Sequence, residues 1–124
     1  MIVCIPSKGR PETDTYKIFE KAGYEVYHFI EPQEIDAYKK VPNLINIGAN
    51  DKGVTYVRNF MLDWCKKKKI DWAWFCDDDV IGFGIYNGKT VRKGAEVLQK
   101  VEKIKELIDS DEYSMSEISY LMDY

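Results

Sequence analysis

The chain has 124 residues, the length of one domain, and its 45% hydrophobic and 31% charged residues exclude a disordered tail. Its net charge of −3 gives no basic field of the kind that binds nucleic acid non-specifically. No apolar run approaches the roughly 20 residues that cross a membrane, and Met1 opens directly into a predicted strand instead of a signal peptide.

The first part of the chain alternates between short apolar runs and amphipathic segments. We predict strands over 1–5, 25–30, 44–47 and 71–76. We predict helices over 11–22, for a short stretch from Pro32, and over 54–67. The apolar residues that share one face of the last of these helices are Val54, Val57, Met61, Trp64 and Cys65. This order of elements implies an α/β fold with a mainly parallel sheet, flanked by helices and joined by right-handed crossovers.

After residue 79 the pattern changes. We predict a hairpin with its turn at Asn87-Gly88, a helix over 94–108, and a last short helix from Ser114. The chain is thus expected to be a single domain with a nucleotide-binding βαβ portion, 1–79, and a hairpin with helices, 80–124.

Three consecutive carboxylates, Asp77, Asp78 and Asp79, directly follow the fourth predicted strand. Like charges this close raise each other's pKa or require a cation. If the segment stays extended, Asp77 and Asp79 point together and Asp78 points away. Two such oxygen ligands, completed by water and phosphate, suit Mg²⁺ or Mn²⁺. The plainer interpretation is a polar turn. In open α/β sheets ligands bind beyond the carboxyl ends of the strands, where this cluster and the loop 6–11 both lie.

The segment Gly53-Val54-Thr55-Tyr56-Val57-Arg58-Asn59, followed further along by Trp74-Phe75-Cys76-Asp77-Asp78-Asp79, resembles the central signature of GT-A glycosyltransferases. The inverting family 2 type is the best match. The opening Ile-Pro-Ser-Lys-Gly-Arg is similar to glycosyltransferase-like proteins of bacteriophages. The resemblance covers residues 1–86 and implies a Rossmann-like GT-A fold that binds a nucleotide-sugar, in a truncated or minimal form.

The resemblance also implies roles by position. The residues implied to bind the donor are Pro6, Ser7, Lys8, Arg10, Glu31, Arg58, Asp77 and Asp78. The residues implied to hold the metal are Asp77 and Asp79. The opening loop and Glu31 would lie near the base and ribose, and Arg58, whose guanidinium offers a planar fork to phosphate, would lie near the diphosphate.

Several of these residues have plainer interpretations. Arg58 also fits a helix-surface ion pair, Lys8 and Arg10 a solvated loop, and Glu31 the acidic start of a helix. His28, the only histidine, is expected to be a satisfied structural residue. No catalytic base can be selected among the acids of the second portion, which include Glu96, Asp109 and Glu117.

The resulting hypothesis is a metal-dependent glycosyltransferase that uses a nucleoside-diphosphate sugar, with a UDP-sugar favoured. Its acceptor is unidentified, and a bacteriophage origin would favour a modified DNA base. Two alternatives stay open: a non-catalytic binding domain, and a nucleotidyltransferase, which the single glycine of the opening loop, Gly9, makes less suitable. A homo-oligomer that completes the site would explain the missing acceptor half.

Cysteine usage bears on the compartment. The three cysteines, Cys4, Cys65 and Cys76, lack metal-ligand spacing and lie among apolar residues, which predicts buried free thiols. Free thiols indicate a reducing compartment, so we expect a cytoplasmic protein, in the host cytoplasm if a phage encodes it.

Overall fold

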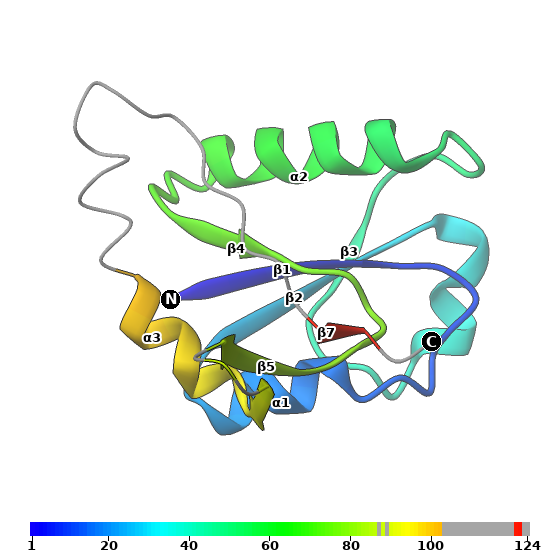
Figure 1. Cartoon of the computed structure of the whole chain (residues 1–124). Coiled ribbons are helices and arrows are strands. Elements are labelled where there is room, and N and C mark those ends of the chain that lie inside the picture. Colours follow the sequence, from blue (N-terminus) through cyan, green and yellow to red (C-terminus); the bar gives the residue numbers. More distant parts are fainter. Residues whose placement is uncertain (87, 89, 103–120, 123–124) are drawn as a thin grey trace.

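The computed structural model describes residues 1–86, 88, 90–102 and 121–122 of the chain (Figure 1). Its centre is a parallel sheet of β1 (Ile2–Ser7), β2 (Glu25–Ile30), β3 (Leu44–Asn46) and β4 (Ala73–Phe75), in the order β3-β2-β1-β4. β1 pairs with β2 along its whole length, from Ile2 opposite Glu25 to Ser7 opposite Ile30. The predicted α/β, Rossmann-like fold class is confirmed.

Helices cover both faces of this sheet, which is why most positions of β1 and β2 are buried. The helix α2 (Val54–Lys67) packs on one face through Met61 and Cys65, which contact Cys4 and Phe29 in one core cluster. The helix α1 (Thr15–Lys21) covers the other face, where Phe19 packs in a second cluster. A 3-10 helix, η1 (Pro32–Tyr38), follows β2 and buries Tyr38 against Ile30.

A small antiparallel sheet adds a further layer beside α1. It consists of β5 (Val80–Tyr86), β6 (Thr90–Lys93) and β7 (Leu121–Met122), in the order β6-β5-β7. Phe83 of β5 meets Phe19 of α1 edge to face, with 5.5 Å between the ring centroids. A 3-10 turn, η2 (Ala95–Val97), and one helical turn, α3 (Leu98–Val101), complete the same core through Ala95 and Leu98. The predicted hairpin is confirmed, although Asn87 of its turn lies outside the described residues.

Several predicted boundaries were wrong. α1 begins at Thr15 and not at Pro11, because residues 11 and 12 form a turn that the Thr13 amide closes on the Arg10 carbonyl. Val54 is 61% exposed, since the first residue of α2 projects beyond the sheet instead of onto it. The helix predicted over 94–108 begins as a 3-10 turn, and its part beyond residue 102 lies outside the described residues, as does the short helix predicted from Ser114.

The three cysteines have the state that the sequence predicted. The three thiols are free and buried, and burial raises their pKa, which keeps them protonated and unreactive.

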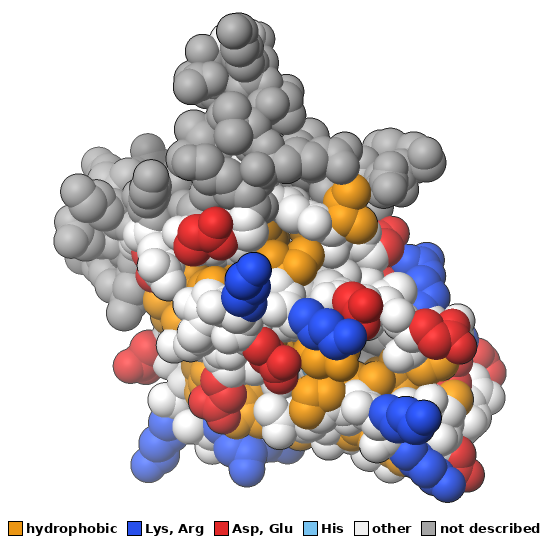
Figure 2. Space-filling model, turned by 90° about the horizontal axis from the view of Figure 1, so that it is seen from below, with side chains coloured by type: hydrophobic (Ala, Val, Ile, Leu, Met, Phe, Trp, Pro, Cys, Tyr) orange, Lys and Arg blue, Asp and Glu red, His pale blue; other side chains and the backbone are white. Residues whose placement is uncertain are grey.

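Figure 2 shows the face that carries α1, on which acidic and basic side chains are interspersed without a field of one sign. Among the described residues, no helix is long and apolar enough to span a bilayer.

Candidate functional site

The candidate site lies at the carboxyl edge of the parallel sheet, where the loops after β1, β2, β3 and β4 meet. Two polar groups of side chains gather there. We call Asp77–Asp79 the aspartate turn. We call Lys8, Glu31, Gln33 and Asp51 the Glu31 cluster.

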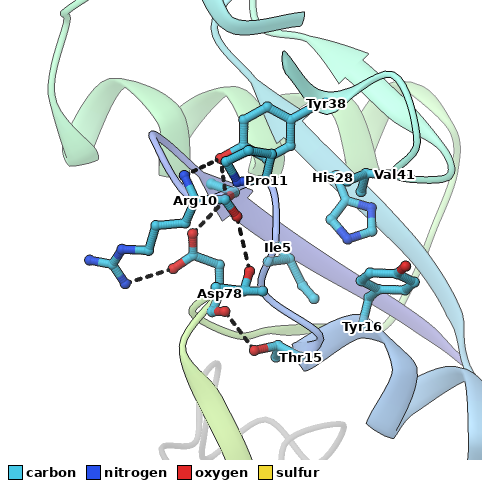
Figure 3. Close-up of a pocket in the computed structure, with 11 residues that line it drawn as sticks. Ile5, Arg10, Pro11, Thr15, Tyr16, His28, Tyr38, Val41 and Asp78 are labelled. Atoms are coloured by element: carbon cyan, nitrogen blue, oxygen red, sulfur yellow. Dashed lines mark hydrogen bonds and ion pairs between the residues drawn. The ribbon is translucent and has the colours of Figure 1, made fainter. Parts of the chain in front are cut away.

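Asp78 is the buried member of the aspartate turn. Its Oδ2 accepts a hydrogen bond from Ser7 Oγ at 2.5 Å, and its Oδ1 lies 3.0 Å from Nη1 of Arg10 (Figure 3). The prediction that Asp78 points away was wrong. It assumed that the strand continues, whereas β4 ends at Phe75 and the chain turns at Asp78 and Asp79, which rotates Asp78 inward.

A chain of hydrogen bonds links the opening loop to Asp78. The Arg10 backbone amide donates to the Tyr38 hydroxyl at 2.9 Å, and the Tyr38 and Ser7 hydroxyls lie 2.7 Å apart. Ser7 has a single hydroxyl hydrogen, which it gives to Asp78, so Tyr38 must be the donor to Ser7. The guanidinium of Arg10 also donates to the Asp78 carboxylate. These hydrogen bonds therefore form a closed ring that begins and ends at Arg10, and the ring fixes the opening loop.

Thr15 ties the aspartate turn to the start of α1. Its hydroxyl lies 2.6 Å from the carbonyl oxygen of Asp78 and 2.9 Å from that of Val80. Sequence reasoning did not identify Thr15 or Tyr38 as part of this edge. Both are ordinary helix residues in the sequence, and only the tertiary fold brings their hydroxyls to the aspartates.

The other two aspartates face arginines. Nη1 of Arg10 is 3.2 Å from Oδ2 of Asp79, and Nη2 of Arg58, on the second turn of α2, is 3.8 Å from Oδ1 of Asp77. Within the described part of the chain, the buried Oδ1 of Asp79 has no hydrogen-bond partner. An orphaned carboxylate oxygen of this kind suits a hard cation.

Few protein side chains are placed to bind such a cation. Among the residues that the structure describes, no three His, Cys, Asp or Glu side chains converge on one point. Asp77 and Asp79 would therefore supply two ligands at most, and the remaining positions would fall to water and ligand oxygens, as Mg²⁺ and Mn²⁺ tolerate.

The Glu31 cluster lies at the ends of β2 and β3. Glu31 is 4% exposed and accepts hydrogen bonds from Lys8 Nζ at 3.2 Å, Gln33 Nε2 at 2.7 Å and the Asp51 amide at 3.0 Å. Burial alone would raise the pKa of this carboxyl, but these bonds outweigh it and hold the pKa below its ordinary value. Glu31 is therefore a charged acceptor at neutral pH.

Sequence reasoning missed Gln33 of this cluster, and it also missed Asp51. Its carboxylate lies 2.5 Å from Lys8 Nζ and 3.2 Å from Gln33 Nε2, and its φ of 54° is left-handed. The hydrogen bond from Lys8 lowers the pKa of Asp51, and that contact raises the pKa of Lys8. The signal that was present is the polar loop 48–53, which follows the third predicted strand at this same edge.

Other predicted residues fall outside these contacts. Pro6 lies within β1, and because side chains alternate along a strand, it faces away from Ser7 and Asp78. His28 has the structural role that was predicted: its Nδ1 lies 2.7 Å from the Pro42 carbonyl oxygen, and its ring meets Tyr16 edge to face. Glu96 is exposed and accepts a bond from the Gly94 amide, while Asp109 and Glu117 lie outside the described residues.

The fold and this edge define a Rossmann-like α/β protein whose charged side chains gather where such sheets bind their ligands. The chain matches the family model of the TET-associated glycosyltransferases over residues 1–119, and it belongs to that family. The resemblance to glycosyltransferases is thereby confirmed. Comparison with curated proteins and with solved structures found no match.

Proposed function

We propose that this glycosyltransferase binds a nucleoside-diphosphate sugar, with a UDP-sugar favoured, through a Mg²⁺ or Mn²⁺ ion at Asp77 and Asp79. The single observation that carries the proposal is the buried Oδ1 of Asp79, which has no hydrogen-bond partner among the described residues and lies in an acidic turn at the carboxyl edge of the parallel sheet. In sugar transfer, a divalent cation at this place neutralises the diphosphate leaving group.

The chain's own residues divide into two tasks. Arg58 extends from the amino-terminal part of α2 and offers a planar fork to the diphosphate. Ser7, Lys8, Arg10 and Glu31 lie at the ends of β1 and β2, where we place the base and ribose, and Asp51 joins them there. A charged Glu31 and Asp51 accept hydrogen bonds from base N–H or ribose hydroxyl groups.

The proposed acceptor rests on the family and on the opening loop. The family name associates these glycosyltransferases with TET. The resemblance of residues 5–10 to bacteriophage glycosyltransferase-like proteins supports a modified DNA base as the acceptor. The acidic net charge predicts that the contact with DNA is local and not held by a broad basic surface.

Calorimetry tests the donor site. We expect one of UDP, GDP, dTDP and CDP to bind in the presence of Mn²⁺ or Mg²⁺, and the affinity to fall by at least about tenfold with EDTA or in Asp79→Asn, because a cation-bridged contact is lost. The matched control is Asp63→Asn, an exposed aspartate on α2, which leaves the affinity unchanged.

The other outcomes separate the alternatives. A folded protein that binds none of the four nucleotides contradicts the donor site. Tighter binding of a nucleoside triphosphate than of the corresponding nucleotide-sugar would favour a nucleotidyltransferase. Cation-dependent binding without sugar transfer to any acceptor would favour a non-catalytic binding domain.

A further inference from the structure

Arg10 is shared between two carboxylates of the aspartate turn. The same nitrogen, Nη1, lies 3.0 Å from Oδ1 of Asp78 and 3.2 Å from Oδ2 of Asp79. The backbone of Arg10 is fixed, because its amide donates to Tyr38. Its side chain is about half exposed, so the guanidinium can leave the aspartates while the loop stays in place.

The two carboxylates depend on Arg10 to different degrees. Asp78 is buried and also accepts a hydrogen bond from Ser7, so it remains satisfied if the guanidinium moves. Asp79 is more exposed, and its second oxygen, Oδ1, has no hydrogen-bond partner among the described residues. The guanidinium therefore provides the positive charge that faces Asp79 in the ligand-free protein.

The other basic side chains of this edge do not occupy that position. Lys8 is bound to Glu31 and Asp51 in the Glu31 cluster. Arg58 is 3.8 Å from Asp77, which is too long for a hydrogen bond. Among the described residues, the basic side chain that is ion-paired with Asp79 is therefore Arg10.

We propose that Arg10 is a positioning residue that makes cation binding at Asp79 depend on the anionic donor. Without donor, the guanidinium neutralises Asp79 and repels a divalent cation. When the donor is present, its diphosphate adjoins the ribose that Arg10 lines and attracts the guanidinium away, since Arg pairs strongly with phosphate, and Asp79 is released to the cation. This inference rests on the proposed function, because it requires the cation and the donor to share this edge.

The test measures Mn²⁺ binding directly, through the electron paramagnetic resonance signal of free Mn²⁺, with and without UDP. In the absence of UDP, we expect Arg10→Gln to bind Mn²⁺ roughly 5- to 50-fold more tightly than the unchanged chain, the range of an ordinary coupling between sites. The factor by which UDP improves Mn²⁺ affinity should shrink correspondingly in the variant.

Lys17→Gln, on α1, is the matched control, because it removes one positive charge that is exposed and paired with Asp14 and not with Asp78 or Asp79. It should change the affinity for Mn²⁺ alone by less than about twofold, since salt screens an exposed charge at that distance. If Arg10→Gln fails to fold, Arg10→Lys replaces it: the ammonium keeps the positive charge but stands on a shorter side chain, so it should tighten Mn²⁺ binding by a smaller factor.

Two negative results are distinguishable. If the unchanged chain binds Mn²⁺ with UDP, and Arg10→Gln binds Mn²⁺ alone no more tightly than the unchanged chain does, the role of Arg10 is overturned and the proposed function stands. If no form of the protein binds Mn²⁺ with or without UDP, both fail together.

Discussion

At the scale of single residues, the hydroxyl of Tyr38 connects the opening loop to the buried aspartate. It accepts from the Arg10 amide and donates to Ser7, which in turn donates to Asp78. Tyr38→Phe keeps the buried ring and removes both bonds. We expect the free energy of unfolding, measured by urea denaturation, to fall by about 1–3 kcal/mol, because the Arg10 amide loses its acceptor. Nucleotide affinity should fall as well, since the loop loses its anchor.

The comparison variant for Tyr38→Phe is Tyr24→Phe. Tyr24 donates to Glu102 at 2.6 Å, near the start of β2 and far along the sheet from the aspartate turn. It should also lose stability but keep its nucleotide affinity. Equal losses of affinity in the two variants would show that Tyr38 acts through general stability alone.

Glu31 makes a second prediction at this scale. Glutamine has nearly the same shape, but its amide nitrogen would face one of the three donors that now point at the carboxylate. We expect Glu31→Gln to lower the free energy of unfolding by about 1–3 kcal/mol. Glu20→Gln, on the exposed side of α1, should stay within about 0.5 kcal/mol. Indistinguishable denaturation curves for the two variants would contradict a buried, charged Glu31.

The sequence predicted which kinds of side chain meet at this edge but not how they pair. Lys8, Arg10 and Asp78 follow strands, and parallel strands end together, so their proximity was predictable. The partners were not. Asp78 turned inward because the strand ended one residue earlier than the apolar pattern indicated and the chain then turns, and the place of Asp51 depends on a left-handed backbone angle.

At the scale of elements, two neighbouring side chains of α2 differ sharply in burial. Met61 is 0% exposed and packs against the sheet, whereas Leu62 is 57% exposed. We expect Met61→Ala to lower the free energy of unfolding by about 2–5 kcal/mol through the cavity that it leaves. Leu62→Ala should cost less than about 1 kcal/mol. Urea denaturation of both variants decides the point, and similar losses would mean that the helix is rotated about its axis.

The interior of each element was predictable, and the ends were less so. α2 and β2 were predicted with the bounds that the structure has, because their apolar patterns are long or sharply delimited. The start of α1 was placed too early because Pro11 fits a first helical position, whereas the Thr15 hydroxyl at the true start bonds the carbonyl oxygens of Asp78 and Val80. Such contacts join residues far apart in sequence and leave no local pattern.

At the scale of the whole molecule, the alternation of strands and helices along the chain predicted the central parallel sheet. It did not predict where the small antiparallel sheet lies. β5 packs on α1, and β7, which comes from the far end of the sequence, pairs with β5. Nothing in the hairpin pattern indicates which face of the central sheet it covers. The consequence for function is that Asp78 and Asp79 lie at the junction of the two sheets, so the stability of this junction and the shape of the site are linked.

Acid should destabilise the whole fold in two steps. Burial lowers the pKa of His28, with its bond to Pro42 and the charge of Asp78 opposing in part, so the folded protein keeps this ring neutral below the ordinary value of 6.5. The unfolded chain binds a proton there, so the free energy of unfolding falls as the pH drops below about 6.5, by at most about 1.4 kcal/mol per pH unit. A second fall should begin near pH 4.5, where unfolded Glu31 takes up a proton that the folded state resists.

Urea denaturation at closely spaced pH values from 7.5 to 3.5 measures both steps. His28→Asn removes the titrating ring, so its free energy of unfolding should be flat between pH 6.5 and 5 while the second fall persists. The reverse holds for Glu31→Gln, which keeps the first step and loses its share of the second. A first step that survives in His28→Asn would assign it to another group, and the buried ring would then make no contribution to the acid sensitivity of the fold.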